Sequence, residues 1–180
     1  MFISLIHGNG IKTINDVHKK LHRVFHNPTD KESCPRYCKI GTMLYVQSSE
    51  PPHDKSDVLN VSEVKVPTGK VTIEMTIAAV TRKDGRNHSI MPNEYRTRLD
   101  PKFRTHMKSL GIEVLDASYK YEGMVCDEEH RSRLATCRIV AECECDDSAV
   151  LEKFAVTGYG RAKYLGLGLP IIKATANADM

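Results

Sequence analysis

The 180-residue sequence contains no apolar run long enough to cross a membrane as a helix. Its first ten residues, MFISLIHGNG, lack the basic region and the small-residue cleavage site of a secretory signal peptide, so we interpret the apolar run as a buried first strand. Without a secretion signal, the six cysteines are expected to be reduced thiols rather than a disulfide framework. The sequence therefore predicts a cytoplasmic protein with no membrane partner.

The glycine-rich segment 157–172, TGYGRAKYLGLGLPII, lacks the spacing of the common nucleotide-binding loops. A dinucleotide-binding fingerprint has a third glycine at G-x-G-x-x-G and joins a strand to a following helix, whereas this segment lacks that glycine and follows an expected helix. A Walker A loop needs Gly-Lys followed by Ser or Thr, and this is absent too. Chemistry on nucleoside triphosphates is therefore not expected.

A strong overall charge is also missing, because the net charge is only +3. The total therefore does not indicate affinity for nucleic acid, but the distribution of charge does. Basic residues gather between positions 82 and 104, where either a nucleic-acid contact or an ordinary solvated surface would explain them. Four of them flank a loop and the start of a helix and are the preferred RNA-binding candidates: Arg82, Arg86, Arg96 and Arg98.

The periodicity of apolar residues predicts an α+β protein. Alternation predicts strands at 1–6, 42–48, 69–82, 112–122, 134–145 and 167–173, and spacings of three and four predict helices at 14–25, 94–109 and 146–156. Segment 58–66 fits a strand or a helix. Thr13 and Asp16 resemble a capping box at the start of the first helix. The order of elements predicts two tandem ferredoxin-like halves packed side by side, residues 1–80 and 81–180.

The glycine-rich loop at 157–168 has two physical interpretations. Glycines permit positive φ angles, and the exposed amides of such turns can form an anion-binding nest. A phosphodiester backbone would suit that nest, but two tight turns packed against a helix would give the same spacing. The candidate RNA-binding residues of the loop are Gly158, Gly160, Arg161, Lys163, Gly166 and Gly168.

His18 lies at the edge of the apolar stripe of the first expected helix. A histidine in such a place is either a boundary residue bonded to a carbonyl or a group that transfers protons near neutral pH. The pattern alone leaves both interpretations open.

A zinc site is a competing interpretation for four nearby residues, because histidine and cysteine both bind zinc. His22 and His26 are one helical turn apart, and Cys34 and Cys38 follow them. The order and spacing match no common zinc module, so no metal is expected.

The segment GYGRAKYLGLGLPII resembles the signature loop of the RAMP superfamily of CRISPR-associated proteins, and it looks most similar to the CasE family of repeat endoribonucleases. The family motif G-x-G-x-x-K-x-x-G-x-G is matched by the four glycines and Lys163. The resemblance implies that His18, in an H-x-x-L context, is catalytic and that Arg23 steadies the charge on the phosphate. The family often has a tyrosine three residues before the histidine, where this sequence has Asn15.

The function implied by the resemblance is cleavage of CRISPR repeat hairpins in precursor crRNA without a metal or other cofactor. Attack by the ribose 2′-OH would leave a 2′,3′-cyclic phosphate, and the protein would stay bound to the mature crRNA within a Cascade-like complex. The alternative is a RAMP subunit that holds the hairpin without cutting it.

Overall fold

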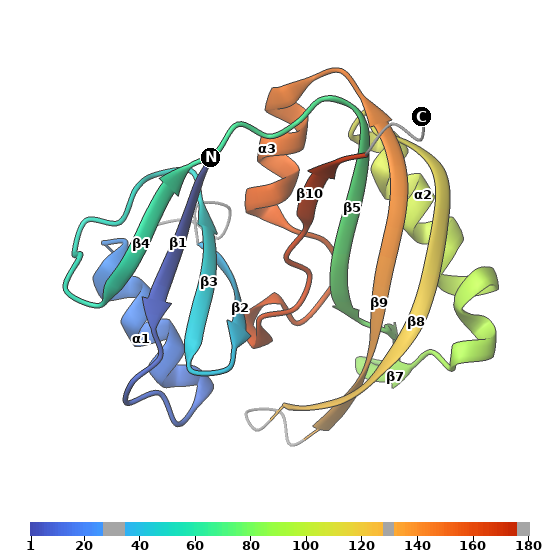
Figure 1. Ribbon diagram of the computed structural model, residues 1–180. Coiled ribbons are helices and arrows are strands. Elements are labelled where there is room, and N and C mark those ends of the chain that lie inside the picture. The colour runs from blue at the N-terminus through green and yellow to red at the C-terminus, as the bar shows by residue number, and fades with distance from the viewer. Residues whose placement is uncertain (27–34, 128–131, 176–180) are drawn as a thin grey trace.

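The computed structural model describes residues 1–26, 35–127 and 132–175, which form two four-stranded antiparallel sheets with helices packed on them (Figure 1). The expected α+β class, with two tandem ferredoxin-like halves, is confirmed.

The first half places one helix on one sheet. Its elements are β1 (Phe2–His7), α1 (Ile14–Val24), β2 (Arg36–Ile40), β3 (Met43–Ser48) and β4 (Val58–Glu63), and its strand order is β2-β3-β1-β4. The capping box is present, because the Thr13 side chain accepts from the Asp16 amide while the Asp16 carboxylate accepts from the Thr13 amide. The apolar stripe of α1 packs on the sheet and forms a core with Ile6, Leu44 and Val46.

The second half places two helices on one face of its sheet. Its strands are β5 (Gly69–Ala78), β8 (Glu113–Asp127), β9 (Ser132–Cys145) and β10 (Ile171–Ala174), in the order β10-β5-β9-β8. The helices are α2 (Asp100–Ser109), preceded by a π-helical turn, η2 (Tyr95–Leu99), and α3 (Ser148–Thr157). Phe103 of α2 and Phe154 of α3 lie in one core with the inward residues of β5, so both helices cover the same face.

Short elements complete the second half. The strands β6 (Val80–Lys83) and β7 (Arg86–Ser89) form a hairpin. One 3₁₀ turn, η1 (Pro92–Glu94), precedes η2, and another, η3 (Lys163–Leu165), follows α3. When the four strands of each main sheet are renumbered 1 to 4 along the chain, both sheets have the order 4-1-3-2, as in a ferredoxin-like sheet.

Several boundaries differ from those expected from the sequence. The two sheets divide between Glu63 and Gly69 rather than at residue 80, because β5 pairs with β9 and β10. Segment 69–82 is two strands, β5 and β6, in different sheets. Strand β2 was missed, and the last strand begins at Ile171 instead of residue 167 because residues 167–170 complete the glycine-rich loop.

The halves meet where α3 and the loop after it face the first sheet, as Figure 1 shows. The Met1 ammonium lies 3.8 Å from the Glu152 carboxylate, and the Val64 amide of the linker donates to the Met1 carbonyl at 2.9 Å. The loop after α3 then runs to β2 of the first half. Within the described residues, every helix is too short or too polar to cross a membrane.

Candidate active site

The site begins with His18 on the second turn of α1. Val17 and Leu21 are buried against the first sheet, and this fixes the rotation of the helix so that His18 is half-buried at its edge. The His18 Nε2 atom lies 3.3 Å from the main-chain carbonyl oxygen of Tyr164, which is 146 residues away in η3. This contact fits a boundary histidine bonded to a carbonyl. It also leaves open a histidine that transfers protons, because the carbonyl belongs to the glycine-rich loop.

The glycine-rich loop is built from tight turns held by main-chain bonds. A Cβ atom at Gly168 would lie 2.0 Å from the Tyr159 carbonyl oxygen, and the φ angle of +76° is one that other residues rarely adopt. Three of its glycine amides donate to carbonyls of the protein: Gly158 to Phe154 at 2.8 Å, Gly166 to Lys163 at 3.0 Å and Gly168 to Thr76 at 2.7 Å. These three amides therefore do not form the anion-binding nest suggested by the glycine spacing.

A cavity of about 110 Å³ separates α1, β2 and the loop. It brings together residues from both ends of the chain. Its polar lining comprises His18 and His22 from α1, Arg36 and Tyr37 from β2, and Lys163 and Tyr164 from η3. A site that combines a histidine with two cations can bind a phosphate group and exchange a proton beside it.

The two cations are held by the carboxyl end of α3. The Lys163 Nζ donates to the carbonyls of Thr157 at 2.8 Å and Gly158 at 3.1 Å, and the Arg36 Nε donates to the Thr157 carbonyl at 3.0 Å. The negative end of the helix dipole favours positive charge there. Burial, followed by the nearby Arg36 charge, lowers the pKa of Lys163. The positions of both charges are thus fixed by the protein.

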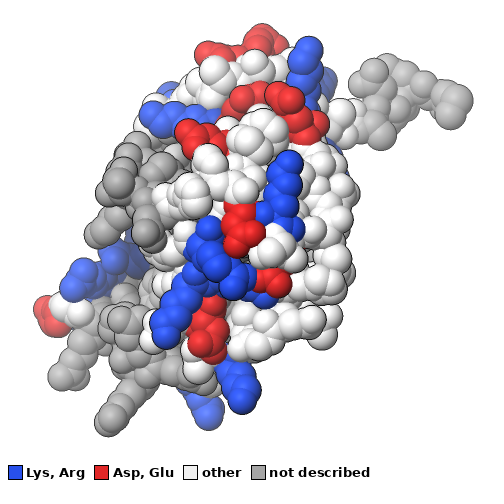
Figure 2. All heavy atoms as spheres, turned by 90° about the vertical axis from the view of Figure 1, so that its left-hand side faces the viewer, with Lys and Arg blue, Asp and Glu red and all other residues white. Residues whose placement is uncertain are grey.

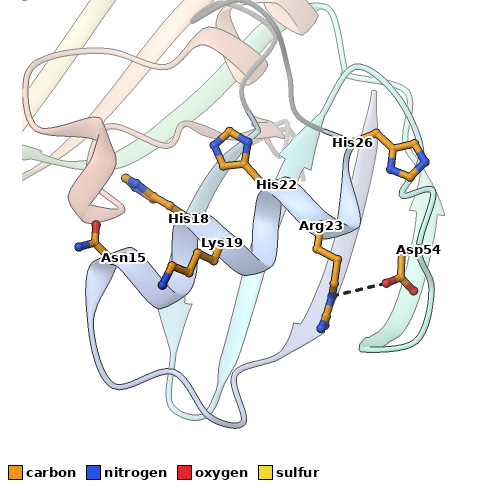
Figure 3. Close-up of a pocket in the computed structure, with 7 residues that line it drawn as sticks. All are labelled: Asn15, His18, Lys19, His22, Arg23, His26 and Asp54. Carbon is orange, nitrogen blue, oxygen red and sulfur yellow. Dashed lines mark ion pairs between the residues drawn. The ribbon is translucent and has the colours of Figure 1, made fainter.

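Arg23 does not share this cavity. Its guanidinium forms ion pairs with Asp54, at 3.5 Å, and with Asp57. Figure 3 shows the side chain directed toward Asp54 and away from His18. Five residues of helix place Arg23 about 140° around the axis from His18. The geometry therefore favours a structural ion pair over contact with the same phosphate.

A wide open groove of about 820 Å³ follows the solvent side of α1 (Figure 3). Asn15, His18, Lys19 and His22 line it along the helix, and Asp54 lies at its far end with Arg23 and His26. Figure 2 shows this side of the molecule, where acidic and basic side chains are interspersed and do not form one continuous basic patch. His18 and His22 border both the groove and the cavity, so the two spaces meet at these histidines.

The zinc alternative gains no support from the part of the chain that is described. Cys34 lies outside the described residues, and among those described no three histidine, cysteine, aspartate or glutamate side chains are grouped to hold a metal. The ring of His26 instead stacks on His53, with centroids 4.6 Å apart.

The basic residues of segment 82–104 lie on elements of the second half that do not line the His18 cavity. Arg82 is exposed on the β6–β7 hairpin, and Arg86 lies on β7, with its side chain outside the described part. Arg96 is exposed on η2, whereas the Arg98 guanidinium donates to the Glu94 carboxylate at 2.7 Å. Arg161 is exposed at the start of the glycine-rich loop. The fold therefore does not gather these arginines into the His18 cavity.

Three residues of the cavity were missed by the sequence reasoning: Arg36, Tyr37 and Tyr164. The strand that carries the first two is only five residues long, and it precedes a two-residue turn into β3. Gly41 in that turn, with a φ angle of 58°, was a usable hairpin signal. Tyr164 contributes its main-chain carbonyl, for which a sequence carries no residue-specific signal.

The chain was compared with known proteins. No family model and no curated protein matches it. Solved structures do share its fold over almost the whole length. The CRISPR-associated protein Cas6e from Escherichia coli K-12 superposes with a TM-score of 0.68 at 15% identity, covering 97% of this chain and 100% of that chain. The chain has the Cas6e fold.

Two further structures agree with the Cas6e fold. Thermus thermophilus Cse3, bound to an RNA that represents a pre-cleavage complex, has a TM-score of 0.65 at 14% identity and covers 96% and 98% of the two chains. A chain in the E. coli Cascade complex, bound to a PAM-containing double-stranded DNA target, has a TM-score of 0.58 at 13% identity and covers 97% and 100%. At these identities the comparison shows the fold alone.

Proposed function

We propose that this protein is an endoribonuclease that cleaves CRISPR repeat hairpins in precursor crRNA without a metal and stays bound to the product. The observation that carries the proposal is the cavity in which His18, from the first helix, meets Arg36 and the loop lysine Lys163. The Cas6e fold supports it, because solved chains with this fold include an endoribonuclease bound to RNA and a subunit of Cascade.

The proposed reaction uses His18 to move a proton. The ribose 2′-OH attacks the adjacent phosphorus while His18 accepts the hydroxyl proton. The bond from phosphorus to the 5′-oxygen breaks, and the 5′-oxygen takes a proton from water in the open groove, giving a 2′,3′-cyclic phosphate and a 5′-OH. General acid–base catalysis of this kind supplies about a hundredfold to ten-thousandfold. The charges of Arg36 and Lys163 are already in place, so they stabilise the phosphorane without reorganising.

The RNA would reach this cavity along the groove of α1. A single strand lying beside Lys19 and His22 would pass His18 where the groove and the cavity meet. The hairpin duplex would contact Arg82, Arg86, Arg96 and Arg98 through phosphates, because the deep major groove of an A-form helix hides its base edges. Arg161 would add a contact from the loop, and the four loop glycines would shape it. We place the protein in the cytoplasm, with the other subunits of a Cascade-like complex as partners.

A non-catalytic RNA-binding subunit is the second candidate. It is favoured by the contact between His18 Nε2 and the Tyr164 carbonyl, which would satisfy a histidine of purely structural role. It is also favoured by Asn15, which stands where the CasE family often has a tyrosine.

The test incubates the protein with a labelled repeat hairpin from the accompanying CRISPR array in excess EDTA. Cleavage by the wild type, its loss in His18→Ala and a 2′,3′-cyclic phosphate on the product support the enzyme. His53→Ala is the matched control, since that histidine lies outside the cavity and should leave cleavage unchanged. Tight binding without cleavage by the wild type establishes the second candidate, and a requirement for metal would reject the histidine mechanism.

A further inference from the structure

The main-chain carbonyl of Tyr164 receives hydrogen bonds from two side chains of the first half. The Tyr37 hydroxyl donates to it, and the His18 Nε2 lies 3.3 Å from the same oxygen. The rings of His18 and Tyr37 meet edge to face, with centroids 6.5 Å apart. One carbonyl of the glycine-rich loop therefore links the tyrosine to the histidine.

Tyr37 is held firmly enough to fix that carbonyl. Its side chain is only 6% exposed and belongs to the core beneath α1, and its strand pairs it with Val46 of β3. The loop packs closely on it, because a Cβ atom at Gly166 would lie 3.1 Å from the Tyr37 ring and 3.3 Å from its carbonyl oxygen. Gly166 has a φ angle of +78°, which other residues rarely adopt, and an added Cβ atom there would make a tight contact with Tyr37.

The carbonyl determines which nitrogen of His18 carries the proton. A carbonyl oxygen only accepts hydrogen bonds, so the contact at Nε2 requires a hydrogen on Nε2. In the neutral ring the lone pair is then on Nδ1, and only Nδ1 can accept another proton.

We propose that Tyr37 is a positioning residue that holds the Tyr164 carbonyl against His18 and so keeps His18 in the Nε2–H form, with Nδ1 as the nitrogen that exchanges a proton with the RNA. This inference rests on the proposed function for its link to cleavage, but the protonation pattern exists in the protein without RNA. Tyr37 reaches the histidine from β2, and not from the helix position that Asn15 occupies.

The test removes only the Tyr37 hydroxyl, with Tyr37→Phe. The matched control is Tyr45→Phe, which removes a half-buried hydroxyl on the neighbouring strand, where it accepts from Gln47 Nε2 at 3.5 Å. Nitrogen-15 NMR of the free protein reports which His18 nitrogen is protonated and whether the Nε2 proton is protected from exchange with water. Single-turnover cleavage and hairpin affinity are measured on the same variants.

We expect a protected Nε2 proton in the wild type and in Tyr45→Phe, and its loss in Tyr37→Phe. Loss of one buried hydrogen bond should slow cleavage about tenfold in Tyr37→Phe while the hairpin Kd stays within about twofold. A wild-type neutral ring protonated on Nδ1 overturns the proposal, and so does a Tyr37→Phe variant that keeps the protected Nε2 proton, whatever its cleavage rate. If Tyr37→Phe does not fold, the wild-type spectrum still tests the proposal, because a neutral His18 ring protonated on Nδ1 overturns it.

The two proposals fail separately. A wild type with the protected Nε2 proton but no cleavage rejects the endoribonuclease and keeps the positioning contact. A wild type that cleaves through His18 with Nδ1 protonated rejects the positioning contact and keeps the endoribonuclease.

Discussion

The assignment of charge to the phosphate can be tested by comparing Arg23→Ala with Arg36→Ala. The sequence resemblance gives the charge-stabilising role to Arg23, whereas the structure places Arg36 in the His18 cavity and pairs Arg23 with Asp54 and Asp57. Removing one preorganised group that stabilises a developing oxyanion slows a reaction by about a hundredfold to a thousandfold. The two variants therefore separate the two assignments by a wide margin.

For Arg23→Ala the structure predicts a small effect. The Arg23 side chain is 55% exposed and its partners Asp54 and Asp57 are 33% and 29% exposed, so each ion pair is screened by solvent. Exposed pairs of this kind contribute about 0–1 kcal/mol. We expect Tm to fall by at most about 2–4 °C for each pair lost, and cleavage to change less than about threefold.

For Arg36→Ala we expect cleavage to slow by about a hundredfold or more while the hairpin Kd changes little. The assay is single-turnover cleavage of the labelled hairpin at saturating protein, with melting curves for each variant. A hundredfold loss in Arg23→Ala at unchanged Kd, together with near wild-type cleavage by Arg36→Ala, would refute the assignment made from the structure.

Three further outcomes are expected. Gly168→Ala should destabilise the protein by about 2–5 kcal/mol in denaturant unfolding, because the added Cβ atom would displace the Tyr159 carbonyl. The control is Gly85→Ala, which has a φ angle of +76° but open space around its Cβ atom and should lose only about 1–2 kcal/mol of unfolding free energy. Equal losses in the two variants would contradict the role of the close contact between Gly168 and the Tyr159 carbonyl. Burial raises the pKa of the Cys143 thiol to about 12, so the contribution of the neutral thiol to stability is complete below the unfolded pKa near 9 and is lost as pH rises toward 12. Between pH 9 and 11 the unfolding free energy of the wild type should therefore fall more steeply than that of Cys143→Ala, by up to about 1.4 kcal/mol per pH unit. Parallel curves for the two proteins would argue against the buried thiol. Arg82→Ala should weaken hairpin binding and reduce the slope of log Kd against log salt by about 0.7–0.9, and an unchanged slope would remove this residue from the phosphate contacts.

Much of the fold was readable from local patterns. The helix at Ile14–Val24, its capping box at Thr13 and the strands at Met43–Ser48 and Ser132–Cys145 each carry a periodic signal that depends only on neighbouring residues. Of segment 58–66, left open between strand and helix, residues Val58–Glu63 form β4 because they pair with β1. No local pattern shows that β5 belongs to the second sheet, since strand pairing decides this.

The candidate site was readable only in part. His18 and Lys163 stand out because one lies at the edge of an apolar stripe and the other lies in a glycine-rich motif. Arg36 and Tyr37 do not stand out, because a five-residue strand has little periodicity and its partner in the site is a main-chain carbonyl. The ion pairs of Arg23 with Asp54 and Asp57 could not be read from the sequence, since these carboxylates are more than 30 residues away in the chain.

The sequence by itself determined the local elements, the glycine-rich loop and the presence of a histidine on the first helix, because these depend on contacts between residues close in the chain. Only the tertiary structure decided that His18 meets the loop 146 residues later, that the loop glycines serve close main-chain contacts, and that Arg36 supplies charge beside Lys163. The physical reason is that packing between the two halves sets which side chains converge, and this packing depends on burial over the whole chain, which no local pattern records.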